Sequence, residues 1–352
     1  MGANGHTNLS RPPLMSSSKT DATDSAHARW GIVLAGGDGT RMRPLIRSWL
    51  GEDRPKQYCA FVGSRSMFQH TIDRARSVVA EEHVVTVIGQ GHRKFIAESA
   101  DARVPWVVLE QPGNLGTALG VFLATAYVLA ENPEATILLL PSDHFVHPEN
   151  RFRDHISHAF ELAEKHRDLI ILVGAIPDRA ETDYGWIDPG QKRTDWSSCL
   201  THGPLQVVSF QEKPGGEEAR AFLRQGCLWS TMVMVVKADT LWTLGRRCLS
   251  GMMDKLDAFL HVLRGIHEGR LDPKSEATAL AALYNDLKPA DFSRDVLQRI
   301  PERSLVLPMH GVDWCDWGVP QRVTETLAKL GRNPLFPPHV LKNVMESAIQ
   351  PQ

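Results

Sequence analysis

The residues Gly31-Ile32-Val33-Leu34-Ala35 form a short apolar run, and Gly36-Gly37-Asp38-Gly39-Thr40-Arg41 follows it at once. The run predicts a buried parallel strand, and the glycines after it predict a turn whose N–H groups can approach a phosphate. Thr40 would add a hydroxyl donor, and Arg41 a fixed charge. An ordinary flexible turn between strand and helix is the alternative for a glycine cluster taken alone. The segment matches neither a Walker loop nor the G-x-G-x-x-G dinucleotide fingerprint, so its Arg-containing ending is distinctive.

Short apolar segments alternate with helical patterns beyond this stretch. We expect further strands at residues 84–88, 106–109, 137–140, 170–174, 207–210, 232–236 and 304–307. Helical spacing marks residues 67–79, 92–99, 117–131 and 150–167, mainly helical structure is expected over residues 250–287, and one helix with a Pro-rich tail is expected after residue 320. This order predicts an α/β protein with a Rossmann-like, mixed but mostly parallel sheet and helices on both faces.

The ends of the chain differ in composition from its middle. Residues 1–28 are rich in Ser, Thr, Asn, Gly and Pro and contain few large apolar residues, which predicts a disordered N-terminal tail. We expect one domain over residues 29–330, with a helical insertion at about residues 250–287, and a C-terminal tail over residues 331–352.

Composition excludes several classes of protein. Hydrophobic residues make up 42% and charged residues 23% of the 352 residues, which argues against a disordered or fibrous chain. The formal net charge of −2 provides no global positive field for nucleic acid or a membrane surface, so we expect neither as a partner. The five cysteines contain no C-x-x-C pair, and neither a secretory signal nor a membrane-length apolar run is present. We therefore expect a cytoplasmic protein.

A second basic element follows the glycine-rich segment at Arg54-Pro55-Lys56-Gln57. A lysine fixed after a proline could complete a phosphate cage as a point charge, although such a turn taken alone is typical of a solvated surface. Together the two elements resemble the signature of sugar-phosphate nucleotidyltransferases. The Pro-Lys-Gln form is most similar to the mannose-1-phosphate guanylyltransferases of that family.

Further segments resemble the family in the same order along the chain. They are Gln111-Pro112-Gly113-Asn114-Leu115-Gly116-Thr117-Ala118, Pro141-Ser142-Asp143-His144, Thr182-Asp183-Tyr184-Gly185-Trp186-Ile187, Phe210-Gln211-Glu212-Lys213-Pro214 and Trp314-Cys315-Asp316-Trp317-Gly318. The resemblance covers about residues 30–330 and implies the nucleotidyltransferase fold. It also implies transfer of GMP from GTP to mannose 1-phosphate, which gives GDP-mannose and pyrophosphate.

The resemblance assigns roles residue by residue. Arg41, Lys56 and Asp143 would be catalytic, and Asp143 and Asp316 would hold Mg²⁺, which hard oxygen ligands around a triphosphate favour. The nucleotide would contact Leu34, Ala35, Gly36, Gly37, Gly39, Thr40, Arg41, Gln111, Asn114, Gly116 and Thr117. The sugar phosphate would contact Asp143, Tyr184, Gly185, Glu212, Lys213 and Ser230. For residues 111–118, the alternative to nucleobase binding is a tight connection that ends in a helix N-cap.

Two departures from the family pattern, at Ser230 and Met232, matter for the site. Where the family usually has Trp-Asn-Ser-Gly, this chain has Trp229-Ser230-Thr231-Met232, which removes an amide and adds bulk on the sugar side. The same chemistry with another sugar 1-phosphate or nucleoside triphosphate is therefore an alternative, and a non-catalytic sugar-nucleotide-binding homologue is another. A homodimer through the helical segments could form. The short segment after Gly331 cannot supply the C-terminal barrel of fused family members, so we expect no phosphomannose isomerase activity.

Overall fold

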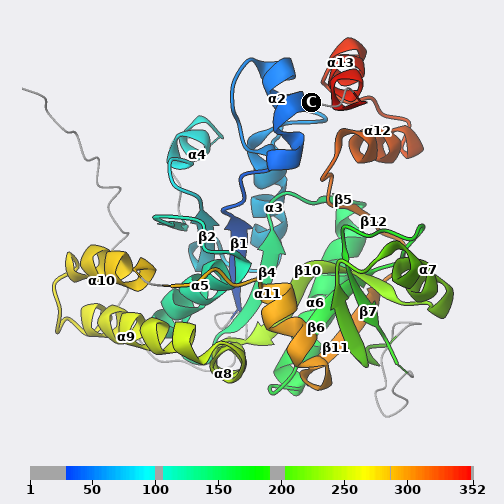
Figure 1. Ribbon diagram of the computed structural model, residues 1–352. Coiled ribbons are helices and arrows are strands. Elements are labelled where there is room, and N and C mark those ends of the chain that lie inside the picture. The colour runs from blue at the N-terminus through cyan, green and yellow to red at the C-terminus, as the bar shows by residue number, and fades with distance from the viewer. Residues whose placement is uncertain (1–28, 100–105, 191–202, 286, 350–352) are drawn as a thin grey trace, which may run out of the picture.

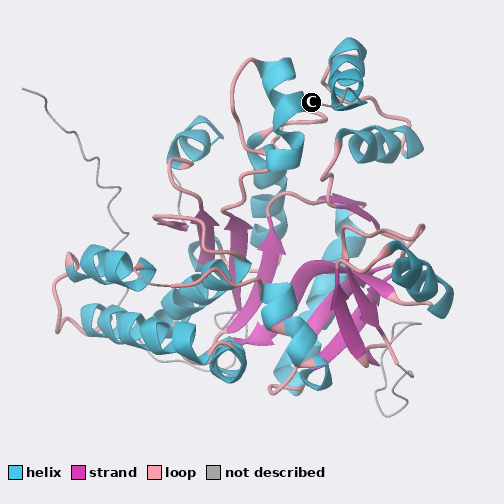
Figure 2. Ribbon diagram, viewed as in Figure 1, coloured by secondary structure: helices cyan, strands magenta, loops and turns pink. Residues whose placement is uncertain are grey.

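The structure is a computed structural model that describes residues 29–99, 106–190, 203–285 and 287–349. The predicted N-terminal tail, residues 1–28, lies outside the described residues. A twisted sheet with helices against both faces occupies the centre of the molecule (Figure 1 and Figure 2).

The sheet is mixed, with its strands in the order β3-β2-β1-β4-β10-β6-β11-β8 and with β7 and β9 branching from β10. The strands are β1 (Arg29–Ala35), β2 (Val84–Ile88), β3 (Val107–Glu110), β4 (Thr136–Pro141), β6 (Ile170–Ala175), β7 (Gly185–Asp188), β8 (Leu205–Gln206), β9 (Ser209–Glu212), β10 (Leu228–Lys237) and β11 (Ser304–Met309). Strands β1 to β4 are mutually parallel, whereas β10 runs antiparallel to both β4 and β6. The α/β class with a mixed, mostly parallel sheet is confirmed.

Successive side chains of each strand point to opposite faces of the sheet, so the core forms two layers. Ile32 and Leu139 face one layer, while Val33 and Leu138 face the other. Helices α5 (Thr117–Glu131), α8 (Ala238–Cys248) and α9 (Ser250–His267) cover the first face, and α3 (Met67–Arg76), α4 (Arg93–Ser99) and α6 (Glu149–Lys165) cover the second. Helix α5 is apolar around nearly its whole circumference because it lies between the sheet and α8 and α9.

A third apolar cluster lies beyond the carboxyl ends of the strands. Helices α2 (Arg43–Leu50), α12 (Pro320–Lys329) and α13 (Pro338–Ile349) surround it, next to a two-stranded sheet of β5 (Phe145–His147) and β12 (Asp313–Cys315). Helix α13 stands where the sequence predicts a Pro-rich tail, and Phe336 and Val340 bury that segment in the cluster. In the described part of the chain, the remaining helices are α7 (Gly216–Gln225), α10 (Ser275–Tyr284) and α11 (Phe292–Asp295), together with five short 3-10 turns.

The strand predicted at residues 207–210 is wrong in its bounds. Two short strands, β8 and β9, replace it because the chain changes partner between them: the N–H of Val207 donates to Ser304, and that of Val208 donates to Asp188. Strand β9 then pairs with β7, which the sequence pattern does not identify as a strand. The pairing of β5 with β12 is likewise not predicted by the sequence. Among the described residues, no helix is both long and apolar enough to cross a bilayer.

Candidate functional site

The glycine-rich loop leaves β1 at the carboxyl end of the parallel strands. Gln57 fixes its path, because the side-chain Nε2 donates to the carbonyls of Ala35 at 2.9 Å and Gly37 at 2.8 Å. Gly39 has a φ of +59°, and a Cβ there would lie 3.0 Å from the backbone nitrogen of Lys56. Both the conformation and the space therefore require glycine. Thr40 begins a 3-10 turn (Thr40–Met42) and is exposed.

Lys56 joins this loop to two other segments. Its side chain is 5% exposed, and its ammonium lies 2.9 Å from Asp143 Oδ2. The ammonium also donates to the backbone carbonyl of Asp316, 260 residues away in the chain. Asp143 stands just after β4, and Asp316 just after β12. The structure thus brings together three residues that the resemblance assigns to catalysis and metal binding.

The Asp316 carboxylate is held on several sides. Its Oδ1 accepts hydrogen bonds from the Tyr184 hydroxyl at 2.8 Å, the Gly318 N–H at 2.9 Å and Arg322 at 2.9 Å. Its Oδ2 lies 3.5 Å from the guanidinium of Arg41, which also contacts Asp183 at 2.7 Å. The Arg41 side chain is half-exposed, so its guanidinium lies at the solvent-facing edge of the site.

Arg322, on α12, is a site residue that the sequence pattern does not indicate. Its side chain is 9% exposed and contacts Glu181 at 2.8 Å, Asp183 at 3.0 Å and Asp316 at 2.9 Å. The guanidinium also lies over the Tyr184 ring, 4.8 Å from its centroid. A single arginine in an amphipathic helix is usually solvated, so only its short separation from Asp316 in the sequence could have suggested a role.

The two aspartates are strongly held in the ionised form. Burial disfavours the charge on Asp143, but the Lys56 ammonium outweighs it and keeps the pKa below the ordinary value. Burial acts in the same sense on Asp316, yet Lys56 and Arg322 lower its pKa to about 2. The carboxylates are therefore available as anionic oxygen ligands at neutral pH.

This donor set fits Mg²⁺. Asp143 Oδ1 has only His144 near it, at 3.7 Å, and Asp316 Oδ2 has only the long Arg41 contact among the interactions of the described residues. No group of three His, Cys, Asp or Glu side chains that could enclose a metal occurs in the described part of the chain. Mg²⁺ is commonly held by one or two carboxylates, with substrate phosphates and water completing the shell, so a site of two aspartates suits it.

The segment predicted to hold the nucleobase follows β3. The Gln111 side chain is buried beside the glycine-rich loop, with Nε2 2.7 Å from the position a Cβ would take on Gly36. Its Oε1 accepts a hydrogen bond from the hydroxyl of Tyr284, 173 residues away, at 3.0 Å. Sequence reasoning does not include Tyr284 in the site. In the sequence, Tyr284 is a single tyrosine in a segment with an ordinary helical pattern, and nothing else there indicates a role in the site.

The rest of that segment is fixed to the loop before α11. Asn114 Oδ1 accepts from the N–H of Gly116 at 3.1 Å, and the Thr117 hydroxyl accepts from the N–H of Phe292 at 2.8 Å. Gly116 has a φ of +86°, and a Cβ there would collide with the Ala290 carbonyl at 2.2 Å. These contacts explain the residue types structurally, so a direct contact of Asn114, Gly116 or Thr117 with a base stays a prediction.

Apart from Asp143, which follows β4, the predicted sugar-side residues lie on or next to β7, β9 and β10. Gly185 pairs with Glu212, and a Cβ on this glycine would lie 2.8 Å from the Glu212 carboxylate. Lys213 has a φ of +47°; its side chain is 59% exposed, and its Nζ is 3.4 Å from Glu212 Oε1. Burial raises the pKa of Glu212 above its ordinary value, against the attraction of Lys213. We expect the charge of Lys213 to be available to an anion.

Strand β10 is irregular at the two positions that depart from the family pattern. Its pairing with β6 shifts register between Ser230 and Met234, and Met232 has a φ of +56°. The N–H of Met232 faces the Ser230 hydroxyl at 3.4 Å, and the Ser293 hydroxyl lies 3.1 Å from the Met232 sulfur. A methionine thus occupies a backbone conformation that favours glycine.

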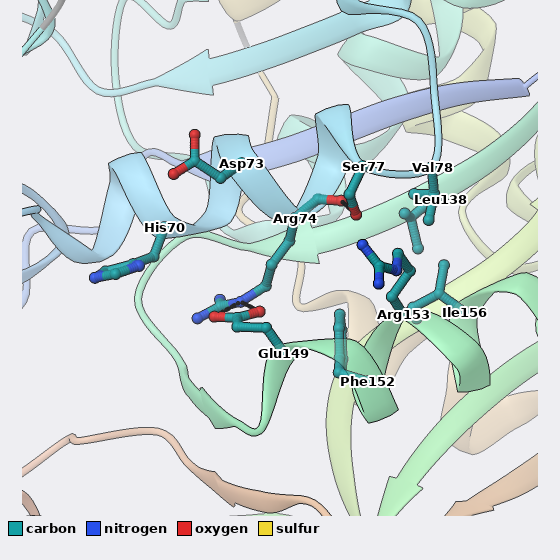
Figure 3. A pocket seen from close by; sticks show the side chains of 10 residues that line it. All are labelled: His70, Asp73, Arg74, Ser77, Val78, Leu138, Glu149, Phe152, Arg153 and Ile156. Atoms are coloured by element: carbon teal, nitrogen blue, oxygen red, sulfur yellow. Dashed lines mark hydrogen bonds and ion pairs between the residues drawn. The ribbon is translucent and has the colours of Figure 1, made fainter.

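A separate cavity of about 180 Å³ lies between α3 and α6, and none of the predicted site residues lines it (Figure 3). Arg74 points into it and is paired with Glu149 at 2.9 Å, while its second nitrogen donates to the carbonyl of His144 at 3.2 Å. Arg74 therefore supports the segment that carries Asp143 from behind.

Comparison with known proteins agrees with this arrangement. A family model described as nucleotidyl transferase matches residues 30–261. The chain belongs to this family.

Two curated relatives illustrate the likeness. The mannose-1-phosphate guanylyltransferase of Klebsiella pneumoniae is 30% identical over 212 residues, which is 59% of this chain and 42% of the relative. The alginate biosynthesis protein AlgA of Pseudomonas aeruginosa is 30% identical over 301 residues, which is 85% of this chain and 58% of the relative. The chain spans about half the length of these curated relatives.

A solved structure shows the same fold. It is described as mannose-1-phosphate geranyltransferase from Thermus thermophilus and superposes with a TM-score of 0.70 at 26% identity. The match covers 85% of this chain and 79% of the other.

Proposed function

We propose that this protein transfers GMP from GTP to mannose 1-phosphate and releases pyrophosphate. The observation that carries the proposal is the convergence of Lys56 on Asp143 and Asp316 beside Arg41, at the end of the glycine-rich loop. Membership of the nucleotidyl transferase family supports the reaction type. The name of the Klebsiella relative supports the choice of guanine nucleotide and mannose.

The chemistry requires positioning and charge neutralisation more than a general base. A phosphate oxygen of mannose 1-phosphate attacks the α-phosphorus of GTP, a new P–O bond forms, and the bond to the oxygen that bridges to the β-phosphorus breaks. The leaving pyrophosphate takes that electron pair. Arg41 and Lys56 are the cations that would offset the charge of the triphosphate and of the departing group, and the N–H groups of Gly36, Gly37 and Gly39 with the Thr40 hydroxyl would hold its oxygens.

Asp143 and Asp316 would hold the Mg²⁺ on which the proposal depends. Held there, Mg²⁺ would supply neutralisation of the negative charge on the phosphates. Arg322 and Tyr184 keep the Asp316 carboxylate in place through the hydrogen bonds to its Oδ1. These residues leave Oδ2 turned toward Arg41.

The remaining predicted residues would bind the two substrates. On the sugar side, Glu212 would accept hydrogen bonds from sugar hydroxyls, Lys213 would hold the phosphate, and Gly185 with Ser230 would leave room for the ring. On the nucleotide side, the backbone of Leu34 and Ala35 and the segment from Gln111 to Thr117 would form the base pocket. We also propose a cytoplasmic setting, on the number and spacing of the cysteines.

The test is pyrophosphate release from the purified protein with Mg²⁺ across GTP, UTP, CTP, ATP and dTTP. Each triphosphate is combined with mannose, glucose, galactose or N-acetylglucosamine 1-phosphate. Release confined to GTP with mannose 1-phosphate supports the proposal. Release with another pair supports the second candidate function, which is the same transfer with a different sugar phosphate or nucleotide. Met232, at a φ of +56° in β10, is the observation that favours this candidate. Silence with every pair overturns both.

A further inference from the structure

Helix α10 contributes a side chain to the segment that follows β3. Tyr284, the last residue of this helix, donates its hydroxyl hydrogen to Gln111 Oε1 at 3.0 Å. Gln111 is 6% exposed, and its own N–H donates to the Ile88 carbonyl at 3.0 Å, so the residue is held at backbone and side chain. Burial raises the pKa of the Tyr284 hydroxyl, which keeps it protonated at neutral pH.

In this contact the amide oxygen of Gln111 faces the Tyr284 hydroxyl. A carboxamide has an acceptor oxygen at one end and two N–H donors at the other, and a rotation of half a turn exchanges them. Tyr284 occupies the oxygen. The nitrogen consequently lies on the side of Gly36, 2.7 Å from the position its Cβ would take, while the oxygen is 3.5 Å from that of Gly120. Glycine at position 36 makes room for the amide nitrogen, whereas the distance at Gly120 is an ordinary van der Waals contact.

We propose that Tyr284 is a positioning residue for nucleobase choice, because it holds Gln111 with its amide N–H donors presented at the edge of the glycine-rich loop. An N–H donor fixed there can donate a hydrogen bond to a carbonyl oxygen on the facing edge of a base. The amino group of a competing base would find no acceptor at that position. The ligand class is therefore the keto-base nucleoside triphosphates, with guanine, uracil or thymine, over those with adenine or cytosine. The inference rests on the proposed function insofar as it places a base beside Gln111.

A structural role for the tyrosine is the rival explanation, because its loss could simply loosen α10. The chain offers a matched control for that effect. The hydroxyl of Tyr127, on α5, donates to the carboxylate of Glu276, which lies on the same helix α10. Tyr127→Phe removes a hydroxyl that anchors α10, and Tyr284→Phe removes one that also orients the amide.

The experiment measures kcat and KM of the full-length protein for GTP, UTP, ATP and CTP, with the sugar phosphate that the wild type uses best. In Tyr284→Phe we expect the ratio of kcat/KM for the preferred keto-base triphosphate to that for ATP to fall about tenfold, mainly through KM. Tyr127→Phe should keep this ratio within about twofold of wild type. Gln111→Met should lower the ratio, and adding Tyr284→Phe to it should lower the ratio no further, because the two act through one amide.

Three outcomes would overturn the inference: an unchanged ratio in Tyr284→Phe, an equal fall in Tyr127→Phe, or a wild type that prefers ATP or CTP. Failure of the proposed function is distinguishable from these. If the wild type uses UTP or dTTP in place of GTP, the guanylyl proposal fails and the ratio test proceeds with that nucleotide. If no turnover occurs, the same ratio is taken from dissociation constants by direct titration. Absence of binding by every triphosphate would overturn both.

Discussion

The two sides of the candidate site are built differently. On the side proposed to bind the phosphates, Asp316 accepts three hydrogen bonds at 2.8–2.9 Å, and Lys56 and Arg322 are buried among carboxylates. On the side proposed to bind the sugar, the Lys213 side chain is 59% exposed, and its Nζ lies 3.4 Å from Glu212. One region is fixed by many mutual charges, and the other by backbone geometry and a few side chains.

Because of this difference, we expect stability and sugar choice to depend on different sides of the site. A buried network leaves each charge with several partners, so a change at one member affects both the fold and the chemistry. An exposed rim can change its residues with little cost in stability, which is how one scaffold can serve different sugars. Substitutions on the two sides should therefore have different signatures, and four experiments examine that expectation.

The largest effect is expected for Asp143→Asn. The change keeps the shape, removes the negative charge and leaves Lys56 without its ion-pair partner. We expect kcat to fall about a thousandfold, which is about 4 kcal/mol of transition-state stabilisation. Pyrophosphate release measures it, with Asp154→Asn on the exposed side of α6 as the control. A variant within tenfold of wild type would remove Asp143 from the catalytic group.

The next effect contrasts stability across the two regions. Arg322→Met leaves Glu181, Asp183 and Asp316 without their shared buried cation and should lower the free energy of unfolding by about 3 kcal/mol. Lys213→Ala should change it by less than about 0.5 kcal/mol, because its side chain is largely exposed, and yet impair turnover. Urea unfolding of both variants measures this. Equal losses of stability would mean that the two sides are not built differently.

Acid should lower the free energy of unfolding through Asp316, whose pKa is lowered from 3.8 to about 2. Because the folded-state pKa lies below the ordinary value, the stabilisation is complete above about pH 4 and is lost as the pH falls toward 2; its size is about 2 kcal/mol. The difference in unfolding free energy between wild type and Asp316→Asn should shrink by that amount between pH 5 and pH 2. A difference independent of pH would contradict the ionic role of this carboxylate.

The smallest effect belongs to the sugar side. Met232→Gly removes bulk and the left-handed strain, and we expect kcat/KM for N-acetylglucosamine 1-phosphate to rise relative to mannose 1-phosphate by about fivefold, or about 1 kcal/mol. Met232→Leu keeps the bulk and should leave the ratio unchanged. If both variants shift the ratio equally, the methionine does not limit the size of the sugar.

The sequence was sufficient for features encoded locally. Continuous apolar runs located β1, β2, β4 and β6, and the helical spacing over 117–131 matched α5. Features that depend on distant partners were not readable. The strand at 207–210 is divided because Val207 and Val208 bond to different strands, and Arg322 and Tyr284 belong to the site only because the fold brings α12 and α10 to it.

The contact between α13 and α2 has a consequence for how the protein is made. Leu45 and Ile46, in the helix that follows the glycine-rich loop, share an apolar cluster with Phe336 and Val340, and the Leu335 N–H donates to the Phe61 carbonyl at 2.8 Å. During synthesis Leu45 and Ile46 leave the ribosome about 290 residues before Phe336 and Val340 do. A nascent chain must carry that exposed apolar face until α13 has also emerged, so emergence of α13, more than folding of the early strands, sets when the nucleotide loop gains its support.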